Sequence, residues 1–205
     1  MKISSILHYL DQGQLTLPCF ARDYVWSPRQ MRCLFDSLYR YHPLGSMILW
    51  TPAAVPTADQ AEPFNNHGGP TQHIVDGQQR ITSIYGAVRG DAPHFYQDRK
   101  PSLPALRFHA EREAFAVFEP SMMGDPLWID LIDFFKPGNA GLGKALDALY
   151  QTPTGPTRIG EYARRLNQLG GILDRSIYVD YLPSDLGLVD AKEIFLLANG
   201  RGGRE

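Results

Sequence analysis

The stretch His73-Ile74-Val75-Asp76-Gly77-Gln78-Gln79-Arg80-Ile81-Thr82 decides the fold and the function that we expect of this chain of 205 residues. Strand-forming residues run into Asp76 and Gly77, and a polar segment with apolar residues at helical spacing follows. The pattern predicts a strand, a tight glycine turn and a polar helix start. Such a junction directs backbone N–H groups, the positive end of the helix dipole and the Arg80 guanidinium toward one point. The sequence therefore nominates residues 76–82 as a phosphate-binding site.

The same residues also have a purely structural interpretation. Asp-Gly is a common turn, aspartate caps helices, and an arginine in a first helical turn is often only solvated. Two well-known phosphate loops are excluded, because the spacings Gly-x-x-x-x-Gly-Lys and Gly-x-Gly-x-x-Gly do not occur at this junction. The residues alone leave the functional and the structural interpretation open.

A helix is predicted directly after the junction. It ends at Gly90, and its buried stripe at helical spacing consists of Ile81, Ile84, Tyr85 and Val88. With that stripe buried, Gln78 and Thr82 lie along one flank of the helix and Arg80 lies along the other. Gln79 is expected to point outward.

Another helix is predicted from residue 28, because its start carries three signals. Ser27 is a suitable N-cap, Pro28 takes the first helical position, and Gln30 stands where a capping box needs it. The buried face of this helix consists of Met31, Leu34, Phe35 and Leu38. The helix ends at residues 43–45, and residues 46–50 follow as a buried strand.

The remaining segments predict a mixed α+β protein. Residues 1–25 read as short apolar groups separated by turn formers, and the proline-rich residues 51–72 read as a loop before the strand that leads into Asp76. Two strands are expected within residues 104–118 and another at 176–182. Helices are expected near residues 129–135, 141–151, 157–169 and 189–198.

The composition is that of an ordinary globular protein, with 43% hydrophobic and 20% charged residues. A net charge of −2 gives no global nucleic-acid signal, so a DNA contact would need a local patch. Two cysteines, Cys19 and Cys33, are too few for a disulfide scaffold, and Cys19 is expected to be a small buried residue. No segment has the ~20 apolar residues of a membrane span. We therefore expect a cytoplasmic protein with no membrane partner. No pair of histidines has metal-ligand spacing, so no metal site is expected.

Four blocks of sequence occur in a fixed order and carry a family resemblance. They are the opening Pro18-x-Phe20-x-Arg22-x-Tyr24-Val25-Trp26 with Gln30, the strand 44–50, the word Asp76-Gly77-Gln78-Gln79-Arg80, and Glu193-Ile194-Phe195 with Asn199 and Gly202. Together they resemble the GmrSD-type restriction endonuclease N-terminal domain family, within the ParB and sulfiredoxin-like superfamily. The resemblance implies a ParB/sulfiredoxin-like mixed-sheet core with flanking helices.

The resemblance also implies a domain organisation. Residues 1–125 would form the ParB-like nucleotide-binding core, and residues 126–205 would be a mostly helical continuation of the same domain. Gly-rich turns usually connect to further structure, so residues 199–203 suggest that the natural chain continues into another C-terminal domain.

The function implied is that of a sensor domain, which binds and hydrolyses nucleoside triphosphates, in a modification-dependent DNA restriction protein of antiphage defence. Its partners would be modified DNA, nucleotide, and a C-terminal nuclease domain or partner subunit. Two alternatives stay open: a non-enzymatic module that binds modified DNA and uses nucleotide only as a conformational ligand, or a nuclease itself.

The resemblance and the residue chemistry together assign candidate roles. Asp76, Gln78, Gln79 and Arg80 are catalytic candidates, and the nucleotide-binding candidates are Gly77, Gln78, Arg80 and Thr82. Arg80 would neutralise phosphate charge, and the two glutamines would hold a phosphate oxygen or orient the attacking water. Asp76 has three candidate roles: it accepts a water proton, holds Mg²⁺, or only caps the helix.

The opening block supplies the candidates for DNA contact. It combines one cation with three aromatic rings, a mixture that suits base stacking, and its residues are Phe20, Arg22, Tyr24 and Trp26. The alternative for the aromatic residues is that they belong to the hydrophobic core.

Overall fold

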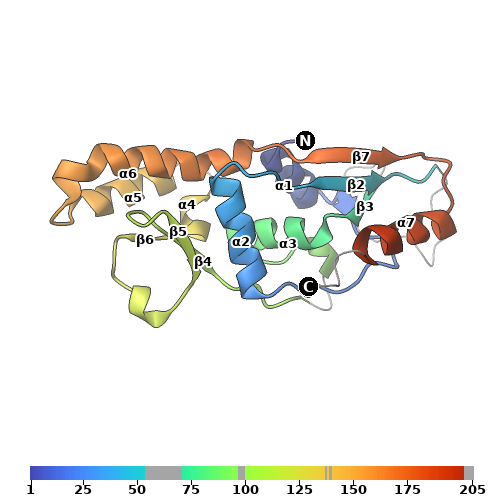
Figure 1. Cartoon of the computed structure of the whole chain (residues 1–205), viewed down its shortest axis with the longest axis horizontal. Coiled ribbons are helices and arrows are strands. Elements are labelled where there is room, and N and C mark those ends of the chain that lie inside the picture. Colours follow the sequence, from blue (N-terminus) through green and yellow to red (C-terminus); the bar gives the residue numbers. More distant parts are fainter. Residues whose placement is uncertain (54–70, 97–99, 137, 139, 201–205) are drawn as a thin grey trace.

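A computed structural model describes residues 1–53, 71–96, 100–136, 138 and 140–200 of the chain. Figure 1 shows an elongated arrangement with a separate small sheet toward each end. Helices and strands are mixed throughout, and one of the two sheets combines parallel with antiparallel pairs, so the predicted α+β class is confirmed. Most of the predicted proline-rich loop, residues 54–70, lies outside the described residues.

The larger sheet positions the junction at Asp76. Its strand order is β1 (Leu15–Thr16), β3 (Gln72–Asp76), β2 (Ser46–Trp50) and β7 (Tyr178–Leu182). Strand β2 runs antiparallel to β3 and parallel to β7. The sheet therefore brings residues from four distant parts of the sequence beside one another.

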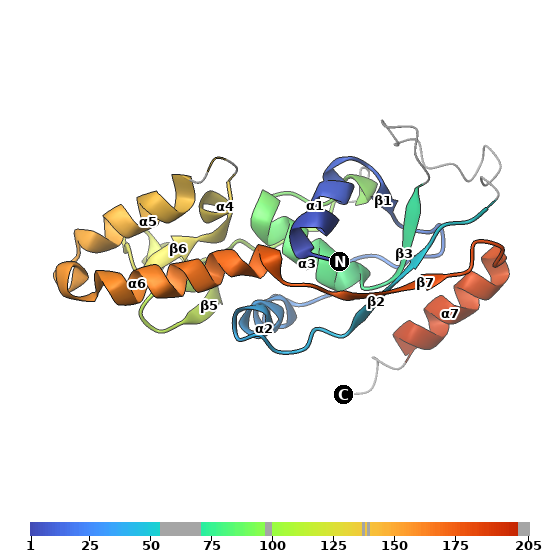
Figure 2. The same ribbon diagram turned by 90° about the horizontal axis from the view of Figure 1, so that it is seen from above.

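Two hydrophobic clusters cover opposite faces of this sheet. Met47 and Leu49 of β2 face the main core, which also receives buried side chains from α1 (Ile3–Asp11), α2 (Pro28–Tyr39) and α3 (Gln78–Arg89). Ile48 and Trp50 face a smaller cluster under α7 (Leu188–Gly200). Figure 2 shows α1 and α7 on opposite sides of the sheet.

Helix α1 was not predicted, and the interpretation of residues 1–25 as short apolar groups between turns is wrong there. The helix buries Ile3, Ile6, Leu7 and Leu10, a stripe that the sequence does contain. Its N-cap residue, Lys2, makes no side-chain capping bond, so the usual start signal is missing.

The predicted start of α2 is confirmed. The Ser27 backbone N–H donates to Gln30 Oε1 at 2.8 Å, and the Gln30 backbone N–H donates to Ser27 Oγ at 3.3 Å, which completes the capping box. The predicted stripe is also buried, and it consists of Met31, Leu34, Phe35 and Leu38.

The smaller sheet is antiparallel and lies beside the second group of helices. Its order is β5 (Ala114–Val117), β4 (Leu106–His109) and β6 (Trp128–Asp130), and the helices are α4 (Leu131–Phe134), α5 (Ala140–Tyr150) and α6 (Gly155–Gly170). The prediction of a helix from residue 129 is wrong at its start, because Asp130 ends β6 and caps α4 through the Ile132 N–H at 3.0 Å. Three 3₁₀ turns complete the described elements: His94–Tyr96, Pro120–Met122 and Gly171–Asp174.

Strand pairs cross the predicted boundary between residues 125 and 126. β4 pairs with β6, and β2 pairs with β7. Both regions contribute to one continuous hydrophobic cluster. The division into a nucleotide-binding core and a helical continuation of the same domain stays a prediction.

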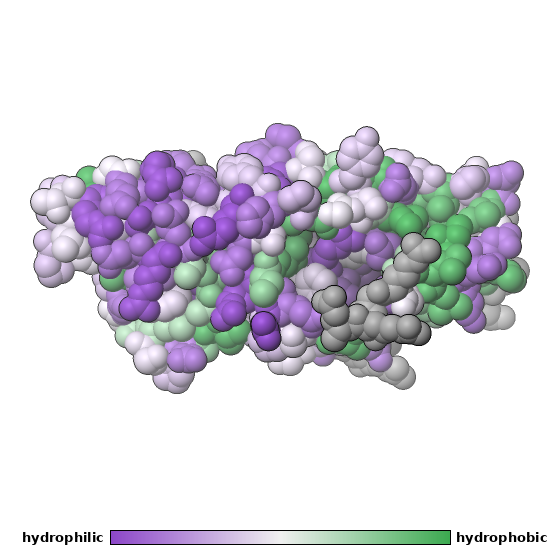
Figure 3. Space-filling model, in the orientation of Figure 1, coloured by the Kyte–Doolittle hydropathy of each residue, from purple (hydrophilic) through white to green (hydrophobic). Residues whose placement is uncertain are grey.

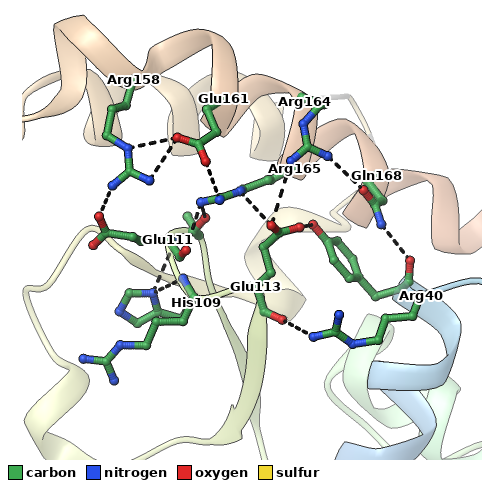
Figure 4. A network of polar contacts seen from close by, with 12 residues as sticks. Arg40, His109, Glu111, Glu113, Arg158, Glu161, Arg164, Arg165 and Gln168 are labelled. Atoms are coloured by element: carbon green, nitrogen blue, oxygen red, sulfur yellow. Dashed lines mark hydrogen bonds and ion pairs between the residues drawn. The ribbon is translucent and has the colours of Figure 1, made fainter.

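An ion-pair network ties α6 to the β4–β5 hairpin and to the end of α2 (Figure 4). Tyr39 donates to Glu113 Oε2 at 2.6 Å, and Glu113 Oε1 pairs with Arg165 Nε at 3.0 Å. Arg165 also pairs with Glu161. Burial, followed by the Glu113 hydrogen bond, raises the pKa of Tyr39 and keeps its hydroxyl a donor. The C-terminal end of α2 is therefore held by polar contacts as well as by packing.

The surface differs between the helices at the two sides of the junction. Figure 3 shows a largely hydrophilic surface over α2 and a hydrophobic one over α7, where Val189, Leu196 and Leu197 are exposed. Among the described helices, none combines the length and the apolar character needed to cross a lipid bilayer.

Candidate functional site

The predicted strand–turn–helix junction is confirmed. β3 ends at Asp76, Gly77 adopts φ +100°, and α3 begins at Gln78. A Cβ at Gly77 would stand 3.0 Å from Met47 Cγ and 3.5 Å from Arg80 Nη2. Because of the positive φ and this close approach, only glycine fits the turn without strain.

The first turn of α3 keeps its backbone donors free of side-chain caps. Gly77 is the N-cap residue, and no described side chain caps the helix. Asp76 therefore does not cap it, and its Oδ2 instead pairs with Arg80 Nη2 at 3.1 Å. Uncapped N–H groups at a helix start attract anions, which is the property that the sequence predicted for this point.

A cavity of about 160 Å³ opens at this helix start. It is lined by Arg22, Trp26, Asp76, Gly77, Gln78, Gln79, Arg80, Ala198 and Asn199. These residues come from three places: the segment before α2, the β3–α3 junction and the last turns of α7. The cavity thus brings together three of the four sequence blocks.

The remaining block, residues 44–50, reaches the site through Arg80. The guanidinium donates to the backbone carbonyls of Leu44 and Ser46 and forms the ion pair with Asp76. Gly45 allows this approach, because a Cβ there would stand 3.0 Å from Arg80 Nη1. Arg80 therefore fastens the start of β2 to the junction, and only part of its hydrogen-bonding capacity remains for a ligand.

Gln79 does not point outward, so that prediction is wrong. The residue is 6% exposed. Its Oε1 accepts from the backbone N–H groups of Val25 at 2.8 Å and Trp26 at 3.3 Å, and its Nε2 donates to the Asp23 carbonyl at 3.0 Å. The segment before α2 lies across this side of α3, a long-range contact that helical spacing alone does not reveal.

Gln78 holds the same segment before α2 at Arg22, the residue that precedes Asp23. Its Nε2 donates to the Arg22 carbonyl at 2.6 Å and to the Tyr96 hydroxyl oxygen at 2.8 Å. Both N–H groups of the amide are then used, and Oε1 remains as an acceptor beside the cavity. Thr82 is fully buried with its hydroxyl 3.5 Å from Tyr96, and it does not line the cavity.

The four candidates for DNA contact divide into two pairs. Arg22 and Trp26 line the cavity, and the Arg22 side chain is exposed with no hydrogen-bond or ion-pair partner in the described part of the chain. Phe20 packs against Phe195 with ring centroids 5.4 Å apart, and Tyr24 shares a 2.9 Å hydrogen bond with Ser83. Burial raises the pKa of Tyr24.

Ala198 and Asn199 also line the cavity, and no local sequence pattern predicts this, although Asn199 belongs to the fourth block. Asn199 Nδ2 donates to the Phe195 carbonyl at 2.9 Å, which turns the amide back along α7. Gly202 of the same block lies outside the described residues. The expectation for Cys19 is also wrong, because this residue is exposed.

A comparison with protein families finds a match that includes the opening block and the junction at Asp76. The model of the GmrSD restriction endonuclease N-terminal domain matches residues 3–167. The chain belongs to the GmrSD family. This assignment gives it a role related to DNA restriction. The GmrSD match ends before β7 and α7, so Ala198 and Asn199 lie beyond the matched residues. A comparison with curated proteins finds no match.

Proposed function

We propose that this GmrSD domain binds the phosphates of a nucleoside triphosphate in the cavity at Gly77 and hydrolyses the nucleotide in response to modified DNA. The observation that carries the proposal is the meeting of the uncapped start of α3 with Arg22 and Trp26, two of the DNA-contact candidates, in one cavity.

The charges around the cavity favour an anion. Among the described residues that line it, two guanidiniums, those of Arg22 and Arg80, face one carboxylate, that of Asp76. Arg22 has no partner among the described residues and adapts to an incoming phosphate, whereas Arg80 is already held by carbonyl oxygens. A charge-assisted hydrogen bond from Arg22 to phosphate is therefore the main new contact that binding would form.

Hydrolysis requires a water placed in line with the γ-phosphate. Water would form the new P–O bond, the bond from the γ-phosphorus to the β–γ bridging oxygen would break, and the water proton would pass to a nearby acceptor. Asp76 is the carboxylate that lines the cavity and would receive the proton, and the Oε1 of Gln78, which has no other partner among the described residues, would orient the water.

Mg²⁺ fits this arrangement as an ion carried in by the triphosphate. Within the described part of the chain, no group of three acidic, histidine or cysteine side chains could hold a metal ion. Triphosphate-bound Mg²⁺ needs only one or two carboxylates from the protein, and Asp76 would supply one.

Response to DNA is proposed to pass through Gln78 and Gln79. Both stand on the first turn of α3, and both hold the segment that contains Arg22 and Trp26. A DNA contact that shifts this segment would shift the two amides, and with them the donors at the helix start. Such shared contacts are the physical basis for coupling between two ligands.

The test is phosphate release by the purified chain, measured with ATP, GTP, CTP and UTP, with and without modified duplex DNA. We expect Arg22→Ala to weaken nucleotide binding by about tenfold or more, because one charge-assisted hydrogen bond is lost. Arg32→Ala is the matched control, since Arg32 is also exposed but lies outside the cavity. Equal effects of both substitutions would contradict the site.

A second candidate function is a DNA-binding module that uses nucleotide without hydrolysing it. The observation in its favour is that Gln79 Oε1 already accepts from two backbone N–H groups, so it is not free to orient a water, and that Asp76 is paired with Arg80. Nucleotide binding without phosphate release, with and without DNA, would favour this second function over hydrolysis.

A further inference from the structure

A second cavity shares two lining residues, Trp26 and Arg80, with the first. Its volume is about 610 Å³, and it runs along the surface of α2 toward the start of β2. It is lined by Trp26, Arg29, Gln30, Cys33, Leu34, Ser37, Pro43, Leu44 and Arg80. We call it the α2 groove.

The α2 groove adjoins the phosphate cavity, because Trp26 and Arg80 line both. The phosphate cavity alone, at about 160 Å³, is smaller than the roughly 300–1,000 Å³ of sites that enclose a whole small molecule. A nucleotide with its phosphates at Gly77 must therefore place its sugar and base elsewhere. The groove has the volume for them, and it begins at the wall of the phosphate cavity.

The lining of the groove suits a flat heterocycle. The Trp26 ring is half-buried, and Leu34, Pro43 and Leu44 add apolar surface. Aromatic and apolar walls with a few polar groups are typical of cofactor and nucleotide sites.

Polar groups for recognition stand along the same groove. Gln30 uses its Oε1 in the capping box, which leaves its Nε2 as a donor. The Arg29 side chain has no ion-pair partner within the described residues, and Ser37 adds a hydroxyl. These groups can donate to the ring nitrogens and carbonyl oxygens of a base or to sugar oxygens.

We propose that the α2 groove binds the nucleoside part of the triphosphate. Because it adjoins the proposed phosphate site, this subsite rests on the proposed function. The chemical class of the ligand is a nucleoside 5′-triphosphate, with the base against Trp26 and the phosphates beside Arg22 and Arg80. An extruded base of a DNA strand has the same flat chemistry, and the experiment separates the two sources.

Cys33 provides a direct readout, because its exposed thiol lines the groove. In a Cys19→Ser background, the labelling rate of Cys33 by a maleimide is measured alone, with each nucleoside triphosphate, with inorganic tripolyphosphate, and with a single-stranded oligonucleotide. At a nucleotide concentration of about ten times its Kd, labelling should slow about tenfold, since only the free groove reacts. Tripolyphosphate should bind without slowing it.

A blocking substitution tests the same subsite by affinity. Ser37→Trp should raise the Kd of the nucleoside triphosphate at least about tenfold by filling the groove, and leave the Kd of tripolyphosphate unchanged. Arg32→Trp, on the same helix but outside the groove, is the control for the added bulk. Thermal melting of each variant reports whether it is folded, and the labelling experiment on unblocked protein stands independently of it.

The outcomes separate the subsite from the function. Nucleotide that binds without protecting Cys33 overturns the subsite and leaves the triphosphate site standing. Protection by the oligonucleotide but not by nucleotide also overturns it and assigns the groove to a DNA base. No binding of any triphosphate overturns both proposals.

Discussion

The backbone N–H of Val25 donates to the side-chain Oε1 of Gln79 at 2.8 Å, across 54 positions of sequence. This bond joins the first turn of α3 to the segment that leads into α2. Gln79 belongs to the family motif Asp-Gly-Gln-Gln-Arg, and its hydrogen bonds hold the opening block of the family pattern against α3. Gln79 is therefore a positioning residue, whatever contact it makes through the cavity that it lines.

The first prediction follows from that bond. Gln79→Ala leaves the Val25 and Trp26 N–H groups and the Asp23 carbonyl without their partner, which should cost about 1–3 kcal/mol of unfolding free energy. Hydrogen exchange of the Val25 amide should accelerate about tenfold for each ~1.4 kcal/mol lost locally.

Gln30→Ala is the matched control for this variant. It removes another glutamine side chain that accepts from a backbone N–H, that of Ser27. Exchange at Ser27 should rise in this control while exchange at Val25 stays unchanged. A Val25 amide that exchanges at the same rate in wild type and Gln79→Ala would show that the bond does not hold the segment.

Arg80 is predicted to contribute to the stability of the fold as well as to nucleotide binding. Arg80→Ala leaves the Leu44 and Ser46 carbonyls without their donor and Asp76 without its counter-ion, for a cost of roughly 2–4 kcal/mol in urea unfolding. Arg80→Lys should recover only part of this, because an ammonium cannot span both carbonyls and the carboxylate as a planar fork does. Equal stability of the lysine variant and wild type would contradict the clamp.

Gly77 is predicted to tolerate no side chain. Gly77→Ala places a Cβ 3.0 Å from Met47 Cγ at φ +100°, and it should lower the unfolding free energy by about 1–3 kcal/mol. Gly160→Ala is the control, because its Cβ meets no atom within 4 Å and its helical position favours alanine. That control should gain about 0.5–1 kcal/mol. A stabilised Gly77→Ala would argue against the left-handed turn.

Stability is predicted to fall in mild acid, in part through His73. This side chain lies beside the Trp50 ring, with centroids 5.7 Å apart, and burial lowers its pKa. In the unfolded chain, His73 binds a proton once the pH falls below its ordinary pKa of 6.5. In the folded chain, the same imidazole stays neutral to a lower pH. The free energy of unfolding should therefore be full above that pH and decrease as the pH falls below it.

His73→Gln should reduce the slope of this decrease, since glutamine does not titrate. Some slope should persist, because burial also lowers the pKa of His94 and of His109. The measurement is urea unfolding of both proteins between pH 7.5 and 5.0. An identical pH slope for the two proteins would refute a contribution from His73.

Local signals predicted the two helices around the site because their physics is local. Ser27, Pro28 and Gln30 act within one turn, and the positive φ that favours glycine at position 77 is a property of the local turn. Local signals likewise predict that residues 76–80 lie together at the start of one helix.

Contacts between distant segments account for what was missed. Helical spacing predicts an outward Gln79 because it cannot show that residues 23–26 cover that side of α3. Asn199 reaches the cavity only because β7 pairs beside β2 and α7 then returns along the sheet. The deciding information is the packing of a loop segment on α3 in the first case and the order of the strands in the second, and no single segment contains either.

The parallel pairing of β7 with β2 has a practical consequence for handling this domain. A fragment cut at residue 167, where the family match ends, would lack β7 and would turn β2 into an unprotected edge strand. Strand β2 would then carry a row of unpaired backbone donors and acceptors beside the apolar side chains of Met47, Leu49 and Trp50. An exposed apolar edge strand of this kind promotes self-association. Soluble expression should therefore depend on retaining residues 178–200, whatever those residues contribute to chemistry.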